Sequence, residues 1–299
     1  MQTDDWSDYQ AFLAIARAGQ LARAASAMGV DATTMGRRLR RLEARLGLTL
    51  CEQTREGQVL TEAGEDLLAR VEAMAAAAAG IGEAAHPGEG LSGTLRISVS
   101  EGFGSAFLAP RIGEFAARHP ALTLDLVASS GFLSPSRHEA DIAVMLSRPR
   151  TGPVVARKLG DYALRLYASP DYLERHGVPE READLAQGHR LVGYIPELIY
   201  APELRYLDEL HPGLQATLRS PSIVAQARLV ASGAGVGVLP CFMATTDARL
   251  VPVIAERRIM RSFWLVTHKD TQRLARVRAA MDWLSETATA NRVVLVPPD

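Results

Sequence analysis

Between residues 31 and 46, large apolar side chains recur at intervals of four, three and four positions. At about 100° per residue these positions form one stripe of a helix. The stripe consists of Met35, Leu39, Leu42 and Leu46. The opposite face carries hydroxyl and guanidinium groups, namely Thr33, Thr34, Arg37, Arg40 and Arg41. With Asp31 as a suitable N-cap, the pattern predicts an amphipathic helix with a buried stripe and an exposed basic face.

A shorter, alanine-rich segment over residues 21–28 precedes this helix, and Gly29 stands between the two as a helix stop. Alanines at positions 24, 25 and 27 allow the backbones of the two helices to approach closely. This is the pattern of a helix-turn-helix, whose second helix enters the DNA major groove with its first turns against base edges. The alternative is a solvated basic helix on an unrelated fold.

The flanking segments complete a small domain. Residues 4–19 predict a first helix that covers the other two, with apolar positions at Trp6, Tyr9, Phe12, Leu13 and Ala16. Residues 48–60 are partly apolar and are interrupted at Gly57, as in a small two-stranded wing. The sequence therefore predicts a winged helix-turn-helix domain over residues 1–61.

A long helix is expected from residue 61 to about residue 79. Its apolar stripe contains Leu67, Leu68, Val71, Met74, Ala75 and Ala78. Such a helix has little to bury against its own small domain, so the pattern predicts that it pairs with the same helix of a second subunit. A plain helical linker is the alternative. Glycine and proline between residues 80 and 90 indicate a hinge, and the linker helix and hinge together occupy residues 62–90.

The remaining chain alternates between strand and helix patterns. A first block has strands over residues 94–100, 122–128 and 141–146, with a helix over residues 103–118. A second block has strands over residues 162–169, 190–194 and 235–239, with a helix over residues 222–232. The last helix, over residues 272–287, belongs again to the first block. The pattern predicts parallel βα units in two α/β lobes, lobe I over residues 91–160 and 268–299 and lobe II over residues 161–267.

Charge separates the two ends of the chain. The formal net charge of all 299 residues is −1, with 22% charged and 47% hydrophobic residues, which is typical of an ordinary globular protein. Residues 17–55, however, contain eight arginines against three acidic residues, a local charge of +5. The basic charge therefore coincides with the helix-turn-helix pattern.

Several other classes of protein are disfavoured. No apolar run reaches the length of a membrane span and the first residues lack a signal-peptide pattern, so a cytoplasmic protein is expected. Cys51 and Cys241 are far apart in sequence and are interpreted as small buried hydrophobes. The histidines lack metal-ligand spacing, and there is no nucleophile elbow or Walker loop. The glycines at 233, 235 and 237 follow a helix and precede a strand, which is the wrong order for a dinucleotide-binding turn. We therefore expect no enzyme activity, no catalytic residue, no metal and no cofactor.

The ordered set of motifs over residues 12–19, 21–25, 37–43, 46–47 and 60–64 resembles the DNA-binding region of LysR-type transcriptional regulators. The resemblance covers essentially the whole chain. It implies an α+β multidomain fold in which a two-lobed, periplasmic-binding-protein-like effector domain occupies residues 91–299. The implied partners are double-stranded DNA, a small-molecule effector and further copies of the chain, as a homodimer and, by analogy with the family, a homotetramer. A small-molecule binding protein without DNA affinity and an enzyme on the α/β lobes are the rival hypotheses.

Two sets of site residues follow. The residues predicted to contact DNA are Arg23, Ala32, Thr33, Thr34, Arg37, Arg38, Arg41 and Arg55. Ala32 and Thr33 stand where the family frequently has Gln-Pro, and an alanine offers only an apolar contact to a thymine methyl group. The residues predicted to bind the effector are Ser100, Glu101, Gly102, Phe103, Ser129, Met145, Tyr194 and Ser222.

The turn over residues 100–104 is the centre of the predicted effector site. A strand end, two glycines and a helix start would present free backbone N–H groups, which suits an anion. Glu101 would repel an acidic ligand unless its side chain turns away. Two alternatives stay open: Ser222 serves only as a helix cap, and Gly102 and Gly104 serve only the turn.

Overall fold

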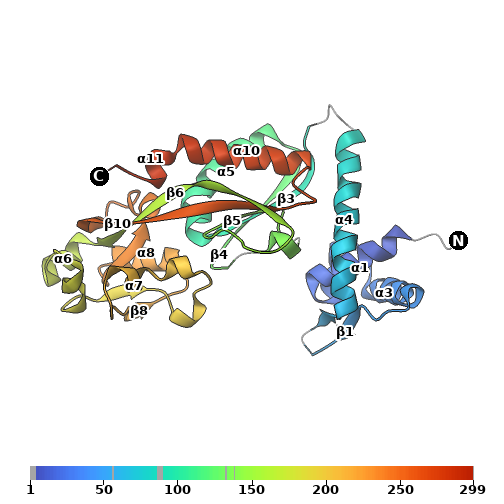
Figure 1. Ribbon diagram of the computed structural model, residues 1–299, viewed down its shortest axis with the longest axis horizontal. Helices are drawn as coiled ribbons and strands as arrows, with labels where there is room; N and C mark the ends of the chain where they lie inside the picture. The colour runs from blue at the N-terminus through green and yellow to red at the C-terminus, as the bar shows by residue number, and fades with distance from the viewer. Residues whose placement is uncertain (1–4, 56, 86–89, 132, 138, 299) are drawn as a thin grey trace. The chain divides into compact units, whose positions relative to one another are not determined.

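The computed structural model describes residues 5–55, 57–85, 90–131, 133–137 and 139–298 (Figure 1). The chain divides into two compact units. The N-terminal unit comprises Met1–Gly88 with Arg137–Glu139, and the C-terminal unit comprises Glu89–Ser136 with Ala140–Asp299.

Three helices open the N-terminal unit: α1 Trp6–Ala18, α2 Leu21–Ala27 and α3 Ala32–Leu46. The Asp31 side chain accepts a hydrogen bond from the Thr34 N–H at 2.7 Å and caps α3. Gly47 ends α3 in the left-handed conformation, with φ of 67°. The helix-turn-helix predicted from the apolar stripe and its flanking cap and stop is confirmed.

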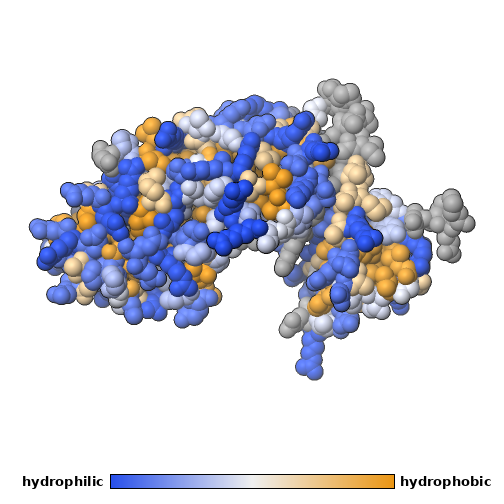
Figure 2. Space-filling view, in the orientation of Figure 1, coloured by the Kyte–Doolittle hydropathy of each residue, from blue (hydrophilic) through white to orange (hydrophobic). Residues whose placement is uncertain are grey.

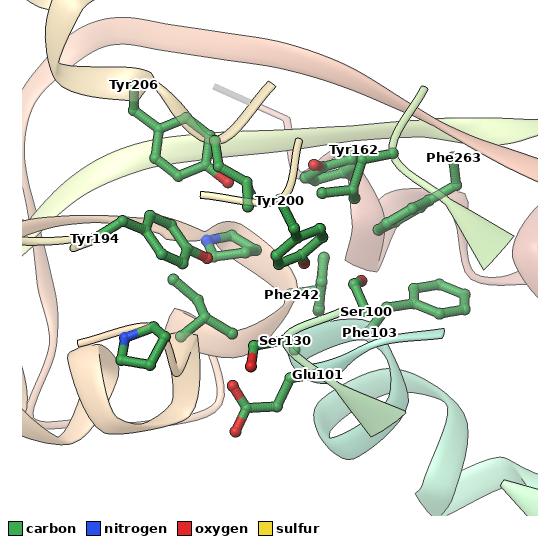
Figure 3. A pocket seen from close by; sticks show the side chains of 16 residues that line it. Ser100, Glu101, Phe103, Ser130, Tyr162, Tyr194, Tyr200, Tyr206, Phe242 and Phe263 are labelled. Atoms are coloured by element: carbon green, nitrogen blue, oxygen red, sulfur yellow. The ribbon is translucent and has the colours of Figure 1, made fainter. Parts of the chain in front are cut away.

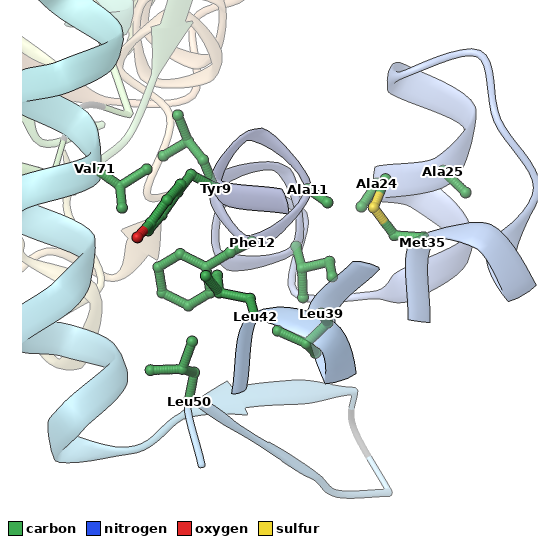
Figure 4. Packing of buried hydrophobic residues seen from close by; sticks show 12 residues of the cluster. Tyr9, Ala11, Phe12, Ala24, Ala25, Met35, Leu39, Leu42, Leu50 and Val71 are labelled. Atoms are coloured by element: carbon green, nitrogen blue, oxygen red, sulfur yellow. The ribbon is translucent and has the colours of Figure 1, made fainter. Parts of the chain in front are cut away.

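The core of this unit lies where the three helices meet (Figure 4). Phe12, Met35, Leu42 and Leu50 have no exposed surface. Ala24 and Ala25 of α2 are also buried, so small side chains bring α2 close to its neighbours. Burying each large apolar side chain stabilises the unit by roughly 1.5 to 3 kcal/mol, and the apolar stripe of α3 is thereby fixed inward.

The wing is an antiparallel pair of strands, β1 Cys51–Gln53 and β2 Gln58–Leu60, as predicted. The Gln58 N–H donates to the Gly19 carbonyl at 2.7 Å, which joins the wing to the end of α1. Gly57 has φ of 139°, and a Cβ atom there would lie 2.2 Å from the Gly19 carbonyl oxygen. Only glycine fits this close approach.

Helix α4, Glu62–Ala85, corrects two predictions. Val71 is fully buried against the core of its own unit, so part of the stripe assigned to subunit pairing is already covered within one chain (Figure 4). The helix also continues through Gly80 and Gly82, where a hinge was expected, because the surrounding alanines have high helix propensity. The rest of the predicted hinge, residues 86–89, lies outside the described residues.

The described residues of the C-terminal unit form an eight-stranded sheet with the order β4-β3-β5-β10-β6-β9-β7-β8. The strands are β3 Gly93–Ser100, β4 Leu122–Ser129, β5 Ile142–Met145, β6 Val154–Ala168, β7 Leu191–Gly193, β8 Leu218–Arg219, β9 Val236–Pro240 and β10 Val251–His268. Strands β3, β4 and β5 are parallel, as are β7, β8 and β9.

The predicted parallel βα units are confirmed in the outer strands of both blocks, but the centre of the sheet is antiparallel. Strands β6 and β10 are long and pair antiparallel with each other (Figure 1). Strand β10 also pairs antiparallel with β5, and β6 does so with β9. These two strands are the crossing segments between the two blocks, and they join both blocks into one sheet.

Helical segments lie between the strands and, in the case of the last two, after the final strand. They are η1 Phe103–Leu108, α5 Ala109–Arg118, η2 Pro135–Arg137, α6 Pro170–His176, η3 Glu182–Ala186, η4 Pro196–Leu198, η5 Pro202–Leu204, α7 Tyr206–Leu210, α8 Ile223–Ala231, α9 Cys241–Ala244, α10 Ala275–Ala290 and α11 Arg292–Leu295. The first of these begins with helical turns at Glu101, two residues earlier than predicted, and η1 has π-helical geometry. A Cβ at Gly104 would lie 2.4 Å from the Ala128 Cβ, so glycine allows this segment to pack on β4.

Candidate functional site

The exposed face of α3 carries most of the residues predicted to contact DNA. Ala32, Thr33 and Arg37 are exposed, and Arg38 is half-buried. Arg23 on α2 and Arg55 in the wing are exposed as well. The opposite face of α3 is fixed by the buried core, so the exposed side chains of α3 face solvent on a rigid helix.

Two of the predicted DNA contacts are engaged within the chain. The Thr34 hydroxyl donates to Asp31 Oδ2 at 2.8 Å and so belongs to the helix cap. Arg41 Nε donates to Asp8 Oδ2 at 2.7 Å, and its Nη2 donates to Asp8 Oδ1 and to Asp5 Oδ2. The Asp8 side chain is fully buried and also pairs with Arg45 at 3.4 Å. Arg41 therefore fastens α3 to α1, although about half of its side chain stays exposed.

A cavity in the C-terminal unit collects residues from both blocks of the sheet (Figure 3). Of the predicted effector residues, Ser100, Glu101, Gly102, Phe103 and Tyr194 line it. Its other aromatic members were not predicted from the sequence; they are Tyr162, Tyr200, Tyr206, Phe242 and Phe263. Its volume is about 20 Å³, which admits about one water molecule.

Three predicted effector residues do not line the cavity. Ser130 and Leu146 are in its wall instead of Ser129 and Met145. Successive side chains at a strand end point to opposite sides, and the Ser129 hydroxyl turns back to donate to the Gly131 carbonyl at 2.6 Å. The third, Ser222, acts through Glu101.

The Ser222 side chain joins the two blocks behind the cavity wall. Its hydroxyl donates to Glu101 Oε1 at 2.8 Å and accepts a hydrogen bond from the Ala225 N–H at 3.0 Å. It therefore caps α8, as the capping alternative held, and at the same time holds Glu101. Gly102 allows close packing, because a Cβ there would lie 2.7 Å from Met243 Sδ.

The four tyrosines of the cavity wall are neutral phenols near pH 7. Burial raises the pKa of Tyr162, Tyr194 and Tyr206. Burial, and secondly the nearby Glu101, raise the pKa of Tyr200 to about 12. The spacing of Tyr194, Tyr200 and Tyr206, six residues apart in a stretch without strong periodicity, is a signal that could have identified this cluster from the sequence.

The described residues also bear on metal sites, reactive thiols and membrane-spanning helices. No group of three or more His, Cys, Asp or Glu side chains within them is arranged to hold a metal ion. Cys51 and Cys241 are free thiols, and burial raises the pKa of Cys51 to about 11 and also raises that of Cys241. No helix in the described part of the chain is long and apolar enough to cross a membrane.

A capped helix-turn-helix with a basic exposed face, followed by a two-block α/β unit with a partly open cavity, defines a DNA-binding regulator with a ligand domain. Residues 6–65 match the family model of the bacterial regulatory helix-turn-helix protein, lysR family, and residues 88–289 match that of the LysR substrate binding domain. The chain belongs to the LysR family of DNA-binding transcriptional regulators.

Individual relatives agree with this assignment. The Mau operon transcriptional activator of Paracoccus denitrificans is 29% identical over 289 residues, covering 94% of this chain and 96% of that protein. The solved structure of CrgA, a LysR-type transcriptional regulator from Neisseria meningitidis, is 26% identical and covers 95% of this chain and 99% of its own, with a TM-score of 0.59. A point variant of full-length OxyR from Pseudomonas aeruginosa, at 19% identity, has the same fold, with a TM-score of 0.73 over 96% of this chain and 95% of its own.

Proposed function

We propose that this LysR-family regulator binds specific sequences of duplex DNA with the exposed face of α3. An effector bound in the cavity of the C-terminal unit controls this DNA binding or the activation of transcription. The observation that carries the proposal is the basic face of α3, which is held outward by a buried apolar stripe and by the Asp31 cap. Thr33 and Arg37 lie four residues apart on that face, within the first turns that contact base edges.

The remaining basic residues divide by role. Arg23 and Arg55 flank the helix and are suited to phosphate contacts, which position the protein without reading sequence. Arg41 is committed to Asp8, so its part is to hold α3 in place. Under this proposal the chain is a cytoplasmic binding protein and regulator without catalytic activity, and domain boundaries near residues 61 and 90 separate the DNA-binding, linker and effector regions.

We expect Arg37→Ala to weaken binding to the operator by roughly 1 to 3 kcal/mol and to relax sequence preference at one position, because a base-reading arginine is lost. Arg17→Ala, on the exposed surface of α1, should cost less and affect all sequences alike. Fluorescence anisotropy at one fixed salt concentration, with DNA flanking the gene and a scrambled duplex, measures both. Unchanged affinity and preference in Arg37→Ala would show that α3 is not the reading helix.

The proposal also includes a homodimer built on α4, assembled further into a tetramer as in the resemblance. Met74, Ala77 and Ala78 are exposed apolar residues on this helix, and Figure 2 shows apolar surface over its middle. An exposed apolar stripe on a long helix is the surface that a second copy of the same helix can bury.

Met74→Glu should therefore drive the protein toward monomer, because it places a charge in the helix pair while the core of the unit is untouched. Ala69→Glu, at an exposed position about 140° around α4 from Met74, is the matched control and should leave assembly unchanged. Sedimentation velocity measures the outcome. A Met74→Glu protein with the sedimentation coefficient of the wild type would mean that α4 is not the dimer interface.

A further inference from the structure

The described side chains that line the effector cavity include one acidic residue and no basic residue. Glu101 is the single carboxylate among the described residues that line it, and no arginine, lysine or histidine accompanies it there. Every other wall residue is aromatic, aliphatic, glycine, proline or serine. An acidic ligand would meet a negative charge in this cavity and no positive side chain to balance it.

One carboxylate oxygen of Glu101 has no hydrogen-bond partner among the described residues. Its Oε1 accepts the Ser222 hydroxyl at 2.8 Å. Its Oε2 is buried and has no hydrogen-bond partner among the described residues. A buried acceptor without a donor destabilises the folded state, and more so when it is charged, so a ligand that donates a hydrogen bond to Oε2 would offset that loss.

The helix start at residues 100–104, which would favour an anion, already carries the carboxylate of Glu101. Glu101 stands in the first helical turn before η1, and Ser222 caps α8. The Glu101 carboxylate therefore lies at the positive end of the helix that leads into η1. Through the Ser222 hydroxyl it also contacts the positive end of α8. The expectation that the turn over residues 100–104 binds an anion stays a prediction, and the Glu101 carboxylate on this turn disfavours it.

Aromatic rings provide the other half of the environment. Tyr194 and Tyr206 are in edge contact, with ring centroids 6.1 Å apart. Tyr162 stacks on Phe263 with centroids 4.1 Å apart. In Figure 3 the hydroxyls of Tyr194 and Tyr200 face the side of the cavity on which Glu101 and Ser130 lie. Neutral aromatic faces attract a cation through their quadrupoles.

We propose that the effector is a small organic cation, with an ammonium or guanidinium group held by the Glu101 carboxylate and by the tyrosine rings around it. This inference rests on the proposed function, since it assigns a ligand class to the effector cavity. The cationic group donates to Glu101 Oε2, and the remainder of the ligand contacts the aromatic wall.

The small size of the cavity couples ligand binding to the arrangement of the two blocks of the sheet. The cavity is partly open and has room for about one water molecule within its walls, so a bound organic ammonium ion moves those walls apart. A ligand shifts an equilibrium only by its preference for one arrangement. The cation therefore favours a wider arrangement of the two blocks, which are joined by β6 and β10.

The test compares ligands of matched shape and opposite charge on the full chain. Benzylammonium is compared with phenylacetate, and butylammonium with pentanoate, by isothermal titration calorimetry and by thermal shift. Tetramethylammonium and guanidinium extend the panel. We expect the cations to bind and to raise the melting temperature, while the carboxylates leave it unchanged.

Glu101→Gln should reduce the affinity for the cations about tenfold or more. Glutamine keeps an acceptor for the Ser222 hydroxyl, so the fold is retained, and a melting curve verifies this. Tyr200→Phe keeps the aromatic face and should change affinity by less than about threefold, since cation–π attraction does not need the hydroxyl. The comparison of cations with carboxylates on the wild type needs no variant, so it decides the matter even if Glu101→Gln is unstable.

Binding of the carboxylates but not of the cations, or binding of neither set, overturns the assignment of ligand class. Cation binding that Glu101→Gln leaves unchanged also overturns it, because the ligand would then lie elsewhere. The proposed function is scored separately on the same preparation. If a bound carboxylate alters sequence-specific DNA binding, the proposed regulator function stands and the cationic ligand class is wrong. If the protein does not bind DNA sequence-specifically, the proposed function is wrong whichever ligand binds.

Discussion

Val71→Glu is expected to destabilise the N-terminal unit by about 3 to 5 kcal/mol, because it removes a buried apolar side chain and buries a charge in its place. Val71 has no exposed surface and packs with Tyr9 in the core of the unit. A loss of this size is a large fraction of the stability of a small domain. The mutation should unfold the DNA-binding unit, not merely separate two subunits.

Hydrogen exchange followed by mass spectrometry distinguishes these outcomes on the full chain. Amides of α1 and α3 should lose protection in Val71→Glu, while those of the C-terminal sheet should keep theirs. Met74→Glu, one turn along the same helix at a side chain that is 46% exposed, should leave α1 and α3 protected. Equal protection in both variants would mean that Val71 is not a core residue of this unit.

The helix-turn-helix could be predicted because its signals are local. The stripe on α3, the cap at Asp31 and the stop at Gly47 all fall within one short segment, and each acts over a single helical turn. The role of Val71 could not be predicted in this way. Its partner Tyr9 is distant in sequence, and a pattern along α4 does not show which of its apolar residues meet their own domain and which meet a second chain.

The sheet shows the same limit. Its parallel outer strands were recognisable as apolar runs of buried length. Strand β10 was missed because its middle contains Glu256, Arg257 and Arg258, where its register with β6 shifts between Val253 and Arg258. An irregular, charged stretch of strand carries no clear period of two.

The residues that line the cavity of the C-terminal unit were predicted only in part. The turn at residues 100–104 and Tyr194 line it, as expected, but most of its aromatic wall comes from segments with no motif. The direction of the Glu101 side chain decides the charge of the cavity, and that direction depends on Ser222, which lies in the other block. A contact between distant segments is not visible in the spacing of either.

Asp8→Asn should destabilise the N-terminal unit by about 2 to 4 kcal/mol, because removing one member of a buried pair leaves the other charge poorly compensated. The buried Asp8 carboxylate binds Arg41 through two hydrogen bonds and pairs with Arg45, whose side chain is only 16% exposed. Fully buried pairs cost about 3 to 5 kcal/mol when one member is lost. The lower value applies here because Arg41 is 54% exposed and is screened by solvent.

Asp5→Ser is the matched control, since Asp5 also contacts Arg41, at 2.9 Å, but is 49% exposed. Serine preserves the N-cap of α1, and an exposed ion pair contributes little, so this variant should be much milder than Asp8→Asn. Urea denaturation monitored by hydrogen exchange in α1 and α3 measures both variants. Because Asp8 fixes α3 on α1, Asp8→Asn should also weaken DNA binding uniformly across sequences, unlike Arg37→Ala. If Asp8→Asn and Asp5→Ser were equally mild, the buried carboxylate would have no part in orienting the reading helix.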